Sequence, residues 1–386
     1  MSLVFEAAVI AAVVMLSLRR GVFLVAALLR SRPMPTLSDH PSITVLVPAW
    51  NEAEAAERLL SGLARLDYPH GELSFVLVCD GCTDNTPALF HTWANGRSDA
   101  RVVELPQRAG KPAALNAGLD ETHTDLVVVL DADLAPRPNF LVELVRPFAD
   151  GRVVAAAAYL RPANADRNIV TRYAAVTTWV HQLVTSAGTD RLGLNPPTLG
   201  AAAYCMTALR RIGGFPMVPI GEDVATSAAL ISRGGRTRFV ATAVADNIVV
   251  SDVDDYLRQH VRWSRGVFGS WRPGVRGPWA QRLESAVSTI GYGDRLVFAA
   301  AVAGAIAGAV PIWVPFLYLA IPGLEIVAAL LKAGVYWKIP SFLFSTAIVF
   351  GLDVLGAVAA VVLHLARRPS LWHSPRTRTV DVNANR

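Results

Sequence analysis

The chain of 386 residues is long enough for one or two domains with some further elements. Its 53% hydrophobic and 17% charged residues are high and low, respectively, for a soluble protein, and the apolar excess lies at the two ends, which predicts a soluble middle between membrane-like termini. The net charge of +5 is carried almost wholly by arginine and suits anionic lipid or a phosphorylated substrate, whereas nucleic acid is not an expected partner because no helix-turn-helix, zinc-finger or RNA-recognition pattern occurs.

Residues 1–32 predict an N-terminal transmembrane segment. The run 3–29 is largely apolar but carries Glu6 and, in mid-run, two arginines. We expect one tilted helix whose arginines snorkel to the membrane interface. A cleaved signal peptide is the alternative, but its basic region should precede the apolar core and no convincing Ala-x-Ala-like site follows, which favours a retained signal anchor. By the positive-inside rule, the following domain is expected in the cytoplasm on account of Arg19, Arg20, Arg30 and Arg32.

Strands and helices alternate after a Pro-rich linker. We expect strands at 43–48, 73–78, 101–105 and 126–130, helices at 53–66 and 86–94, and a further helix opened by 110–116. Such alternation is typical of a parallel sheet with right-handed crossovers, here within a domain at 42–250. The sequence has no Gly-x-Gly-x-x-Gly or Walker loop, which argues against dinucleotide oxidoreductases and P-loop NTPases. With three cysteines in all, the Cys79-x-x-Cys82 spacing lacks a second pair and is treated as incidental.

An acidic pair follows the most apolar of these strands. Residues 126–130 run directly into Asp131-Ala132-Asp133, at the carboxyl end of a strand that we expect to be buried on both faces. Ligands of open α/β sheets bind at that edge, and side chains two residues apart share one face of an extended chain. Two carboxylates held this close suit a hard divalent ion that also holds a phosphate. The alternative is a solvated turn.

Two further stretches carry candidate chemistry. Glu222 and Asp223 follow Gly221 and open a helix that continues to Ser232, where acidic residues can also serve only the helix dipole. Residues 254–271 mix arginine with aromatic residues at helical spacing, and we expect an amphipathic interfacial segment over 251–290. The small-residue run 199–204 is consistent with backbone that closely approaches a ligand.

The last part of the chain predicts a transmembrane region at 296–366. Residues 296–324 carry no charge and could span with a kink at Pro311 or Pro315, and a second apolar run at 341–366 is interrupted only by Asp353. Lys332 and Lys338 lie between the two runs, which leaves open whether the region makes three crossings or contains a re-entrant segment. The basic tail at 367–386 is expected to be disordered.

The ordered motifs resemble the membrane-integrated branch of the family 2 glycosyltransferases, which includes cellulose, chitin and hyaluronan synthases and ceramide glucosyltransferases. The resemblance covers about Ser42 to Trp271. It depends on six stretches in the family's order, namely Val47-Pro48-Ala49-Trp50-Asn51-Glu52, Cys79-Asp80-Gly81-Cys82-Thr83-Asp84, Gly110-Lys111, Asp131-Ala132-Asp133, Gly221-Glu222-Asp223 and Gln259-His260-Val261-Arg262-Trp263. It implies an α/β fold with a GT-A type nucleotide-sugar-binding domain and mainly parallel sheet, flanked by transmembrane helices at both ends.

The resemblance also implies residue roles. Asn51, Glu52 and Asp80 would line the nucleoside pocket, and Lys111 would lie near the phosphates. Asp131 and Asp133 would reach the ribose and diphosphate and hold Mg²⁺ or Mn²⁺. Asp223, with Glu222 beside it, would form the catalytic pair, Asp223 being the general base. Gln259, Arg262 and Trp263 would close on the diphosphate and the acceptor.

The implied activity is an inverting transfer of a sugar from a nucleotide sugar, expected to be a UDP-sugar, to a lipid or glycan hydroxyl. The chain departs from the family in that Cys79 replaces the first of the two acids found in many members, so the nucleoside contacts depend on Asp80 alone. It also has no counterpart of the cellulose synthases' gating loop and few spans for a polymer channel, and these two features argue against a processive polymerase. A processive polysaccharide synthase, a non-catalytic membrane scaffold and a nucleotidyltransferase remain as alternatives. The expected location is the plasma membrane with the catalytic domain in the cytoplasm, and a homo-oligomer is possible.

Overall fold

The computed structural model describes residues 2–29, 34, 37, 39–69, 71–270, 279, 282–284 and 294–365. Arg30, Arg32 and the tail at 367–386, on which two of the expectations above depend, lie outside the described residues, as does much of 271–290.

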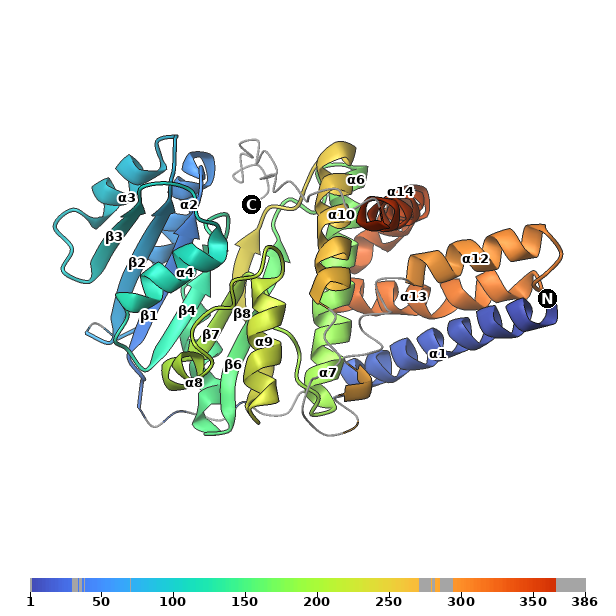
Figure 1. The fold of residues 1–386 in the computed structure, drawn as a ribbon, viewed down its shortest axis with the longest axis horizontal. Helices are drawn as coiled ribbons and strands as arrows, with labels where there is room; N and C mark the ends of the chain where they lie inside the picture. Colours follow the sequence, from blue (N-terminus) through green and yellow to red (C-terminus); the bar gives the residue numbers. More distant parts are fainter. Residues whose placement is uncertain are drawn as a thin grey trace.

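An eight-stranded sheet organises the domain that follows the first helix, in the order β3-β2-β1-β4-β7-β6-β8-β5 (Figure 1). The four expected strands form one parallel block, β3-β2-β1-β4. Next to it, β7 runs antiparallel to both β4 and β6, whereas β6 and β8 are parallel. The bounds are β1 Ile43–Ala49, β2 Leu73–Asp80, β3 Ala100–Leu105, β4 Leu126–Leu130, β5 Ala135–Pro136, β6 Val153–Pro162, β7 Ala201–Cys205 and β8 Arg236–Asn247.

Helices cover both faces of the sheet. All five residues of β4 are buried, and they alternate between two cores: Val128 packs with residues of α2, α3 and α5, whereas Val129 packs with residues of α4, α8 and α9. A strand buried on both faces needs apolar side chains throughout, which is why β4 reads as an unbroken apolar run. The helix bounds are α2 Ala53–Leu63, α3 Thr86–Ala94, α4 Lys111–Asp120, α5 Phe140–Val145, α8 Met206–Arg211 and α9 Glu222–Ser232.

A second group of helices joins the sheet to the apolar ends of the chain. It comprises α6 Ile169–Trp179, a π-helical stretch Val180–Ser186, α7 Ala187–Arg191 and α10 Val253–Ser270. One core cluster contains Tyr159 of β6, Trp179 of α6 and Leu183, together with Leu24 near the end of the first helix. The sheet and the apolar helices therefore share a common core.

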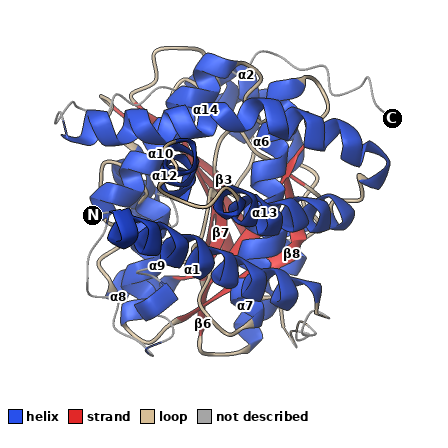
Figure 2. Cartoon of the chain, turned by 90° about the vertical axis from the view of Figure 1, so that its right-hand side faces the viewer, coloured by secondary structure: helices blue, strands red, loops and turns tan. Residues whose placement is uncertain are grey.

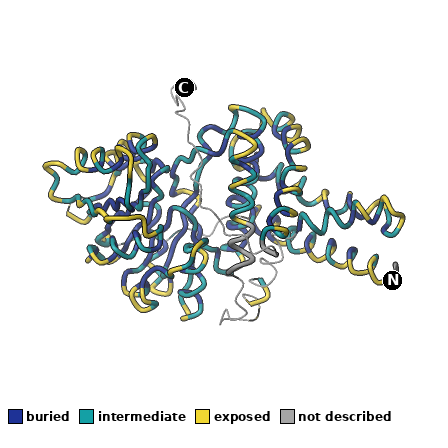
Figure 3. The backbone as a smooth tube through the Cα atoms, turned by 45° about the horizontal axis from the view of Figure 1, so that its top comes forward, coloured by how far each residue is buried: buried dark blue, intermediate teal, exposed yellow. Residues whose placement is uncertain are grey.

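Within the part of the chain that the structure describes, three helices are long and apolar enough to cross a membrane, at Leu3–Leu28, Trp313–Lys332 and Tyr336–Leu363. They belong to α1 Ser2–Leu28, α13 Trp313–Lys332 and α14 Ile339–Leu365 with the short helix before it, and α12 Asp294–Ile306 packs beside the first two. In Figure 1, α1, α12 and α13 project away from the sheet, and their outer surfaces are exposed (Figure 3). α14 runs in another direction: it is seen nearly end-on in Figure 1 and along its length in Figure 2.

Two expectations about these helices are wrong. Residues 296–324 do not form one kinked span, because α12 ends at Ile306 and the chain reverses at 307–312 before α13 begins. The arginines of α1 do not snorkel. Arg19 pairs with Glu284 at 2.5 Å, and Arg20 pairs with Glu325 at 2.6 Å and with Asp294, so acidic partners on other helices hold both charges inside the protein.

Substitution of Gly188 by alanine is expected to loosen the packing of α1 on the sheet domain. A Cβ at this helical position would lie 2.4 Å from the backbone oxygen of Phe23 in α1, and backbone cannot move aside as a side chain can. We expect a loss of about 1–3 kcal/mol in unfolding free energy, typical of overpacking. Thermal unfolding in detergent measures it.

The matched control is Gly21→Ala in α1 itself, where nothing lies within 4 Å of the added Cβ. Alanine favours a helix over glycine by roughly 1 kcal/mol, so this control should be neutral or stabilising. Equal melting temperatures for the two variants would contradict the close contact between α1 and α7.

Candidate active site

Acidic side chains gather at the carboxyl ends of three neighbouring strands. Asn51 and Glu52 follow β1, Asp80 ends β2, and Asp131 follows β4. Because β1 lies between β2 and β4, these ends meet at one edge of the sheet. The strand order reverses between β1 and β4, which is where open α/β sheets bind ligands.

Hydrogen bonds join the loops after β1 and β2. Asn51 adopts a left-handed conformation with φ of 56°. Its Oδ1 accepts from the backbone N–H of Thr83 at 2.8 Å and its Nδ2 donates to the Thr83 hydroxyl at 3.0 Å. Asp84 in turn accepts from the backbone N–H groups of Ala53 and Thr86, each at 3.0 Å. The predicted nucleoside contact of Asn51 would therefore come from an amide that also holds the two loops together.

Asp80 connects the end of β2 to the beginning of α4. Its carboxylate is 3% exposed and accepts the backbone N–H groups of Ala109 at 2.7 Å and Gly110 at 2.9 Å. Gly110, with φ of 94°, precedes the first residue of α4, Lys111. The carboxylate thus fixes the loop from which Lys111 extends, and a nucleoside contact of Asp80 stays a prediction.

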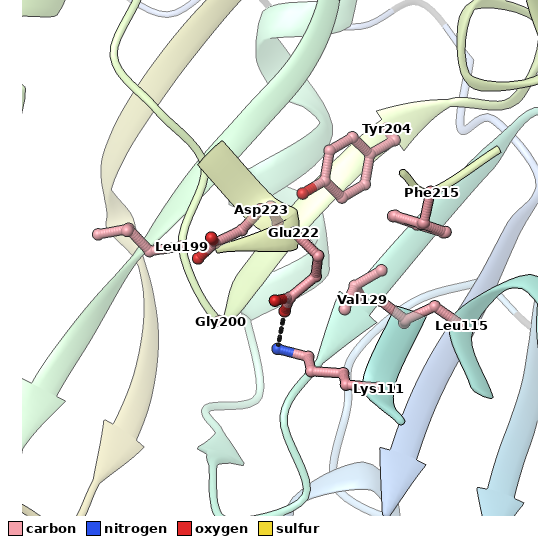
Figure 4. A pocket seen from close by; sticks show the side chains of 10 residues that line it. Lys111, Leu115, Val129, Leu199, Gly200, Tyr204, Phe215, Glu222 and Asp223 are labelled. Carbon is pink, nitrogen blue, oxygen red and sulfur yellow. Dashed lines mark ion pairs between the residues drawn. The ribbon is translucent and has the colours of Figure 1, made fainter. Parts of the chain in front are cut away.

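Lys111 lies between two carboxylates from opposite sides of the site. Its Nζ is 2.7 Å from Oδ1 of Asp131 and 2.6 Å from Oε1 of Glu222, the latter pair drawn in Figure 4. Burial lowers the pKa of Lys111, but the charges of Asp131, Glu222 and Asp223 outweigh burial and raise it. The Lys111 ammonium therefore stays protonated and joins the carboxyl end of β4 to the first turn of α9.

Carboxyl groups crowd the opposite side of Asp131. Burial, and next the charge of Asp131, raise the pKa of Asp133 to about 6. Burial, followed by the charges of Asp133 and Asp131, raises the pKa of Glu52 to about 8. Both shifts come first from burial and next from the negative charge of neighbouring carboxylates. We refer to Glu52, Asp131, Asp133, Glu222 and Asp223 as the acid cluster.

The donor set fits a divalent cation that shares its coordination with phosphate. Among the described residues no three His, Cys, Asp or Glu side chains converge as a complete metal cage. Asp131 and Asp133 supply two carboxylates, which is the usual protein contribution to an Mg²⁺ site completed by substrate phosphates. Gly200 leaves room beside them, since a Cβ there would lie 2.7 Å from Oδ2 of Asp131. The small-residue run at 199–204 thus lies against the carboxylate of Asp131.

Asp223 is held by the backbone of α9 and a short polar chain behind it. Gly221 adopts the left-handed conformation and directly precedes α9. Thr198 and Ser227 donate to the backbone oxygen of Asp223 at 3.2 and 2.9 Å, and Tyr204 of β7 donates to Thr198 at 2.8 Å. The first turn of α9 is therefore attached to the central sheet (Figure 4).

The two adjacent carboxyls of α9 have opposite pKa shifts. Burial would raise the pKa of Glu222, but the Lys111 ammonium outweighs burial and lowers it. Burial, and next the charge of Glu222, raise the pKa of Asp223 to about 7. Neighbouring titratable groups separated in this way commonly divide acid–base roles. Glu222 is the partner of a cation, whereas Asp223 can exchange a proton near neutral pH.

The helix α10 carries the last predicted motif. Gln259 and Arg262 are half-buried, and Trp263 is 41% exposed. Burial lowers the pKa of Arg262, and the charges of Glu222, Asp131 and Asp133 act in the other direction, so its guanidinium faces the acid cluster. The aromatic side of α10 predicted from the sequence is present, since His260 stacks on Tyr256 with ring centroids 3.9 Å apart and lies 5.0 Å from Trp263.

Sequence reasoning missed two contributions to this site. Arg58 of α2 donates to the backbone oxygen of Asp133, and its buried Nε has no hydrogen-bond partner among the described residues. An arginine on an amphipathic helix normally belongs to the solvated face, so nothing in the pattern marks it. The chain from Tyr204 through Thr198 was also missed, because it depends on the antiparallel strand β7, which no local signal predicted.

Comparison with known proteins agrees with this geometry. Residues 40–266, more than half of the chain, match the family model described as glycosyltransferase like family 2. An N-acetylglucosaminyltransferase of Mesorhizobium japonicum is 30% identical over 247 residues, which are 61% of this chain and 58% of that protein. A poly-β-1,6-N-acetyl-D-glucosamine synthase of Staphylococcus aureus is 26% identical over 245 residues, 62% of this chain and 57% of that protein. The matched region therefore spans less than two thirds of either relative.

A solved structure extends the likeness to nearly the whole chain. The mannosyltransferase PcManGT from Pyrobaculum calidifontis, in complex with GDP-Man and Mn²⁺, aligns with a TM-score of 0.59 and 23% identity, covering 95% of this chain and 99% of that one. This confirms the predicted GT-A type α/β fold, and the apolar helices at both ends fit a membrane-integrated member.

Proposed function

Because this chain belongs to glycosyltransferase like family 2, we propose that it transfers a sugar from a nucleotide sugar to an acceptor hydroxyl with inversion at the anomeric carbon. One observation carries this proposal: Lys111 joins the carboxylates Asp131 and Glu222, which brings the expected phosphate site next to the expected base. A reaction that separates a diphosphate from a sugar needs the phosphate site and the base to lie within the length of one substrate molecule.

The donor's diphosphate would lie over Asp131 and Asp133. Departure of the diphosphate builds negative charge, and Lys111 and Arg262 provide preorganised positive charge where it develops. Bound Mg²⁺ or Mn²⁺, held by Asp131 and Asp133, would supply Lewis-acid stabilisation of the same charge. The nucleoside would occupy the edge formed by Asn51, Glu52 and Asp80, beyond the phosphates.

Asp223 would take the proton from the acceptor hydroxyl. Its raised pKa suits a general base at neutral pH, and the hydrogen bond from Ser227 to its backbone oxygen would help to hold it in position. Glu222 would keep Lys111 in place. Gln259 and Trp263 would contact the diphosphate and the acceptor from α10.

The donor we favour is a UDP-sugar, with UDP-N-acetylglucosamine first, since the relatives named above act as N-acetylglucosaminyltransferase and poly-N-acetylglucosamine synthase. A lipid or short glycan is favoured as acceptor because only three described helices are long enough to span, which is few for a polymer channel. The sheet domain would lie in the cytoplasm at the plasma membrane. The pair between Lys338, which precedes α14, and Asp166 of the sheet domain, at 2.5 Å, supports placing the basic link between α13 and α14 on that side.

The pH dependence of kcat/KM tests the base. With a pKa of about 7, Asp223 is ionised and able to accept a proton above pH 7 and is increasingly protonated below it. We expect kcat/KM to fall about tenfold per pH unit on the acidic side, since only the ionised carboxylate is active. Initial rates between pH 5.5 and 8.5 at saturating Mn²⁺ would show the break, and a flat profile down to pH 5.5 would contradict it.

A nucleotide-release assay tests the function as a whole. The full chain in lipid would be offered UDP-, GDP- and dTDP-sugars with Mn²⁺ or Mg²⁺, and labelled products would be separated into lipid and aqueous phases. Label in the lipid phase with one donor supports a lipid glycosyltransferase. Label in a long chain makes the protein a polysaccharide synthase. No release with any donor in a folded sample would favour the scaffold alternative.

A further inference from the structure

Asp353 is an acidic residue in the middle of an apolar helix that could cross a membrane. It is 5% exposed, and a carboxylate in such surroundings is costly unless its oxygens are satisfied. Three groups satisfy it. Tyr256 of α10 donates to Oδ1, Tyr173 of α6 donates to Oδ2 at 2.8 Å, and Arg295 of α12 pairs with it at 3.1 Å.

These contacts belong to a larger buried network. Arg295 pairs also with its neighbour Asp294 at 2.6 Å, and Asp294 accepts from Arg20, which reaches Glu325. We call the connected side chains the buried polar network: Arg20, Tyr173, Tyr256, Asp294, Arg295, Glu325 and Asp353. It links α1, α12, α13 and α14 to α6 and α10. Among the described side chains of α10, Tyr256 is the one that hydrogen-bonds to this network, so it provides a polar attachment of α10 to the apolar helices.

The same helix α10 carries the charge that faces the acid cluster. Tyr256 is fully buried, and its neighbour Leu257 lies 3.7 Å from where a Cβ on Gly356 of α14 would be. His260 stacks on the Tyr256 ring, and its Nδ1 donates to the Tyr256 backbone oxygen at 2.9 Å. Arg262 lies roughly 9 Å from Tyr256 along the helix axis. The helical segment between Tyr256 and Arg262 is short and moves as a rigid unit. The contacts that hold Tyr256 therefore also set the position of Arg262.

We propose that Asp353, acting through Tyr256, is a positioning residue for α10 and thereby aligns Arg262 with the acid cluster. The proposal rests on the proposed function only in giving Arg262 a catalytic task. A displacement of about 1 Å in a catalytic group can reduce the rate roughly 10²-fold, so loss of one buried hydroxyl on α10 is expected to be visible in turnover.

Two tyrosines that donate to the same carboxylate provide a matched comparison. Tyr256→Phe removes the hydroxyl on α10, and Tyr173→Phe removes the one on α6. We expect Tyr256→Phe to lower kcat roughly 10–100-fold and Tyr173→Phe less than threefold, although each leaves Asp353 with one hydroxyl donor fewer. Asp353→Asn should resemble Tyr256→Phe, and Ser345→Ala, a buried residue of α14 that bonds only within its own helix, should resemble the parent.

A double-mutant cycle separates positioning from general damage. In an Arg262→Ala background, Tyr256→Phe should lower kcat no more than twofold further, because the group it aligns is already absent. The proposal is overturned if Tyr256→Phe lowers kcat by the same factor in both backgrounds. It is also overturned if Tyr256→Phe and Tyr173→Phe lower kcat equally.

Hydrogen–deuterium exchange of the full chain in nanodiscs gives a readout that needs no activity. Exchange over 253–263 should rise in Tyr256→Phe and Asp353→Asn and stay at the parent level in Tyr173→Phe. If no donor is turned over, a raised exchange confined to the first two variants still supports the positioning role, whereas unchanged exchange in all three refutes it.

Discussion

Asp223→Asn is expected to lower kcat by roughly 10²–10⁴-fold, the range for loss of a general base, while donor binding stays close to that of the parent. Asparagine has the same shape, and its oxygen can still accept the backbone N–H of Val224, which Oδ1 of Asp223 accepts at 2.7 Å. It cannot accept a proton from the acceptor hydroxyl. Turnover of labelled donor and calorimetric titration with UDP and Mn²⁺ measure the two quantities separately.

Glu222→Gln is the comparison variant, because it changes the neighbouring carboxyl that pairs with Lys111. Glu222→Gln should weaken donor binding, and its kcat/KM should still fall at acidic pH as in the parent. Asp223→Asn should lose this fall of kcat/KM at acidic pH. If Asp223→Asn keeps more than a tenth of the parent kcat, the base lies elsewhere, and Glu222 becomes the first candidate.

Asp131→Asn is expected to reduce kcat/KM by roughly 10²–10³-fold, comparable to the loss of one preorganised electrostatic group. The change removes a charge from the proposed metal site and also the partner of Lys111 at 2.7 Å. Both effects should weaken binding of Mn²⁺ with UDP, which electron paramagnetic resonance of Mn²⁺ measures directly. Chelation of divalent cations should likewise abolish turnover by the parent.

Asp120→Asn is a suitable control, since Asp120 is exposed at the far end of the helix that begins with Lys111. It should bind Mn²⁺ and UDP as the parent does. Unchanged Mn²⁺ affinity in Asp131→Asn would place the metal on other ligands and remove the basis for the paired carboxylates.

The parallel half of the fold could be predicted from sequence because its signals are local. An unbroken apolar run such as 126–130 followed by Asp131 marks both a buried strand and its functional end, and the helix at 86–94 has the predicted bounds. The same locality brought Asn51, Asp80 and Asp131 to one edge of the sheet, since carboxyl ends of parallel strands meet there.

The sequence of residues 139–198 gave no pattern from which a strand or helix could be predicted. Strand β6 contains four consecutive alanines, which favour a strand weakly, and the helical stretch 169–191 is apolar on several sides because it packs between the sheet and the membrane-type helices. The partners of Arg20 and Asp353 are also distant in sequence: Glu325 and Asp294 for the first, Tyr173 and Tyr256 for the second. Such pairings depend on tertiary contacts that periodicity does not encode.

The reversal between α12 and α13 has a consequence for how deeply the protein enters a bilayer. The ion pairs of Arg20 join α1, α12 and α13 at one level, and α12 extends only 13 residues, about 20 Å, from that level to the reversal. A hydrocarbon core is about 30 Å thick, so α12 alone covers about two thirds of that distance.

The turn at the tip of this hairpin, residues 307–312, is suited to a hydrocarbon environment rather than to water. Residues 307–312 are all apolar or glycine, and the backbone N–H groups of Ala307, Gly308, Ala309 and Val310 each donate to a carbonyl of α12. Because these four donors are satisfied within the protein, this part of the turn needs no water to complete its hydrogen bonds and is compatible with hydrocarbon.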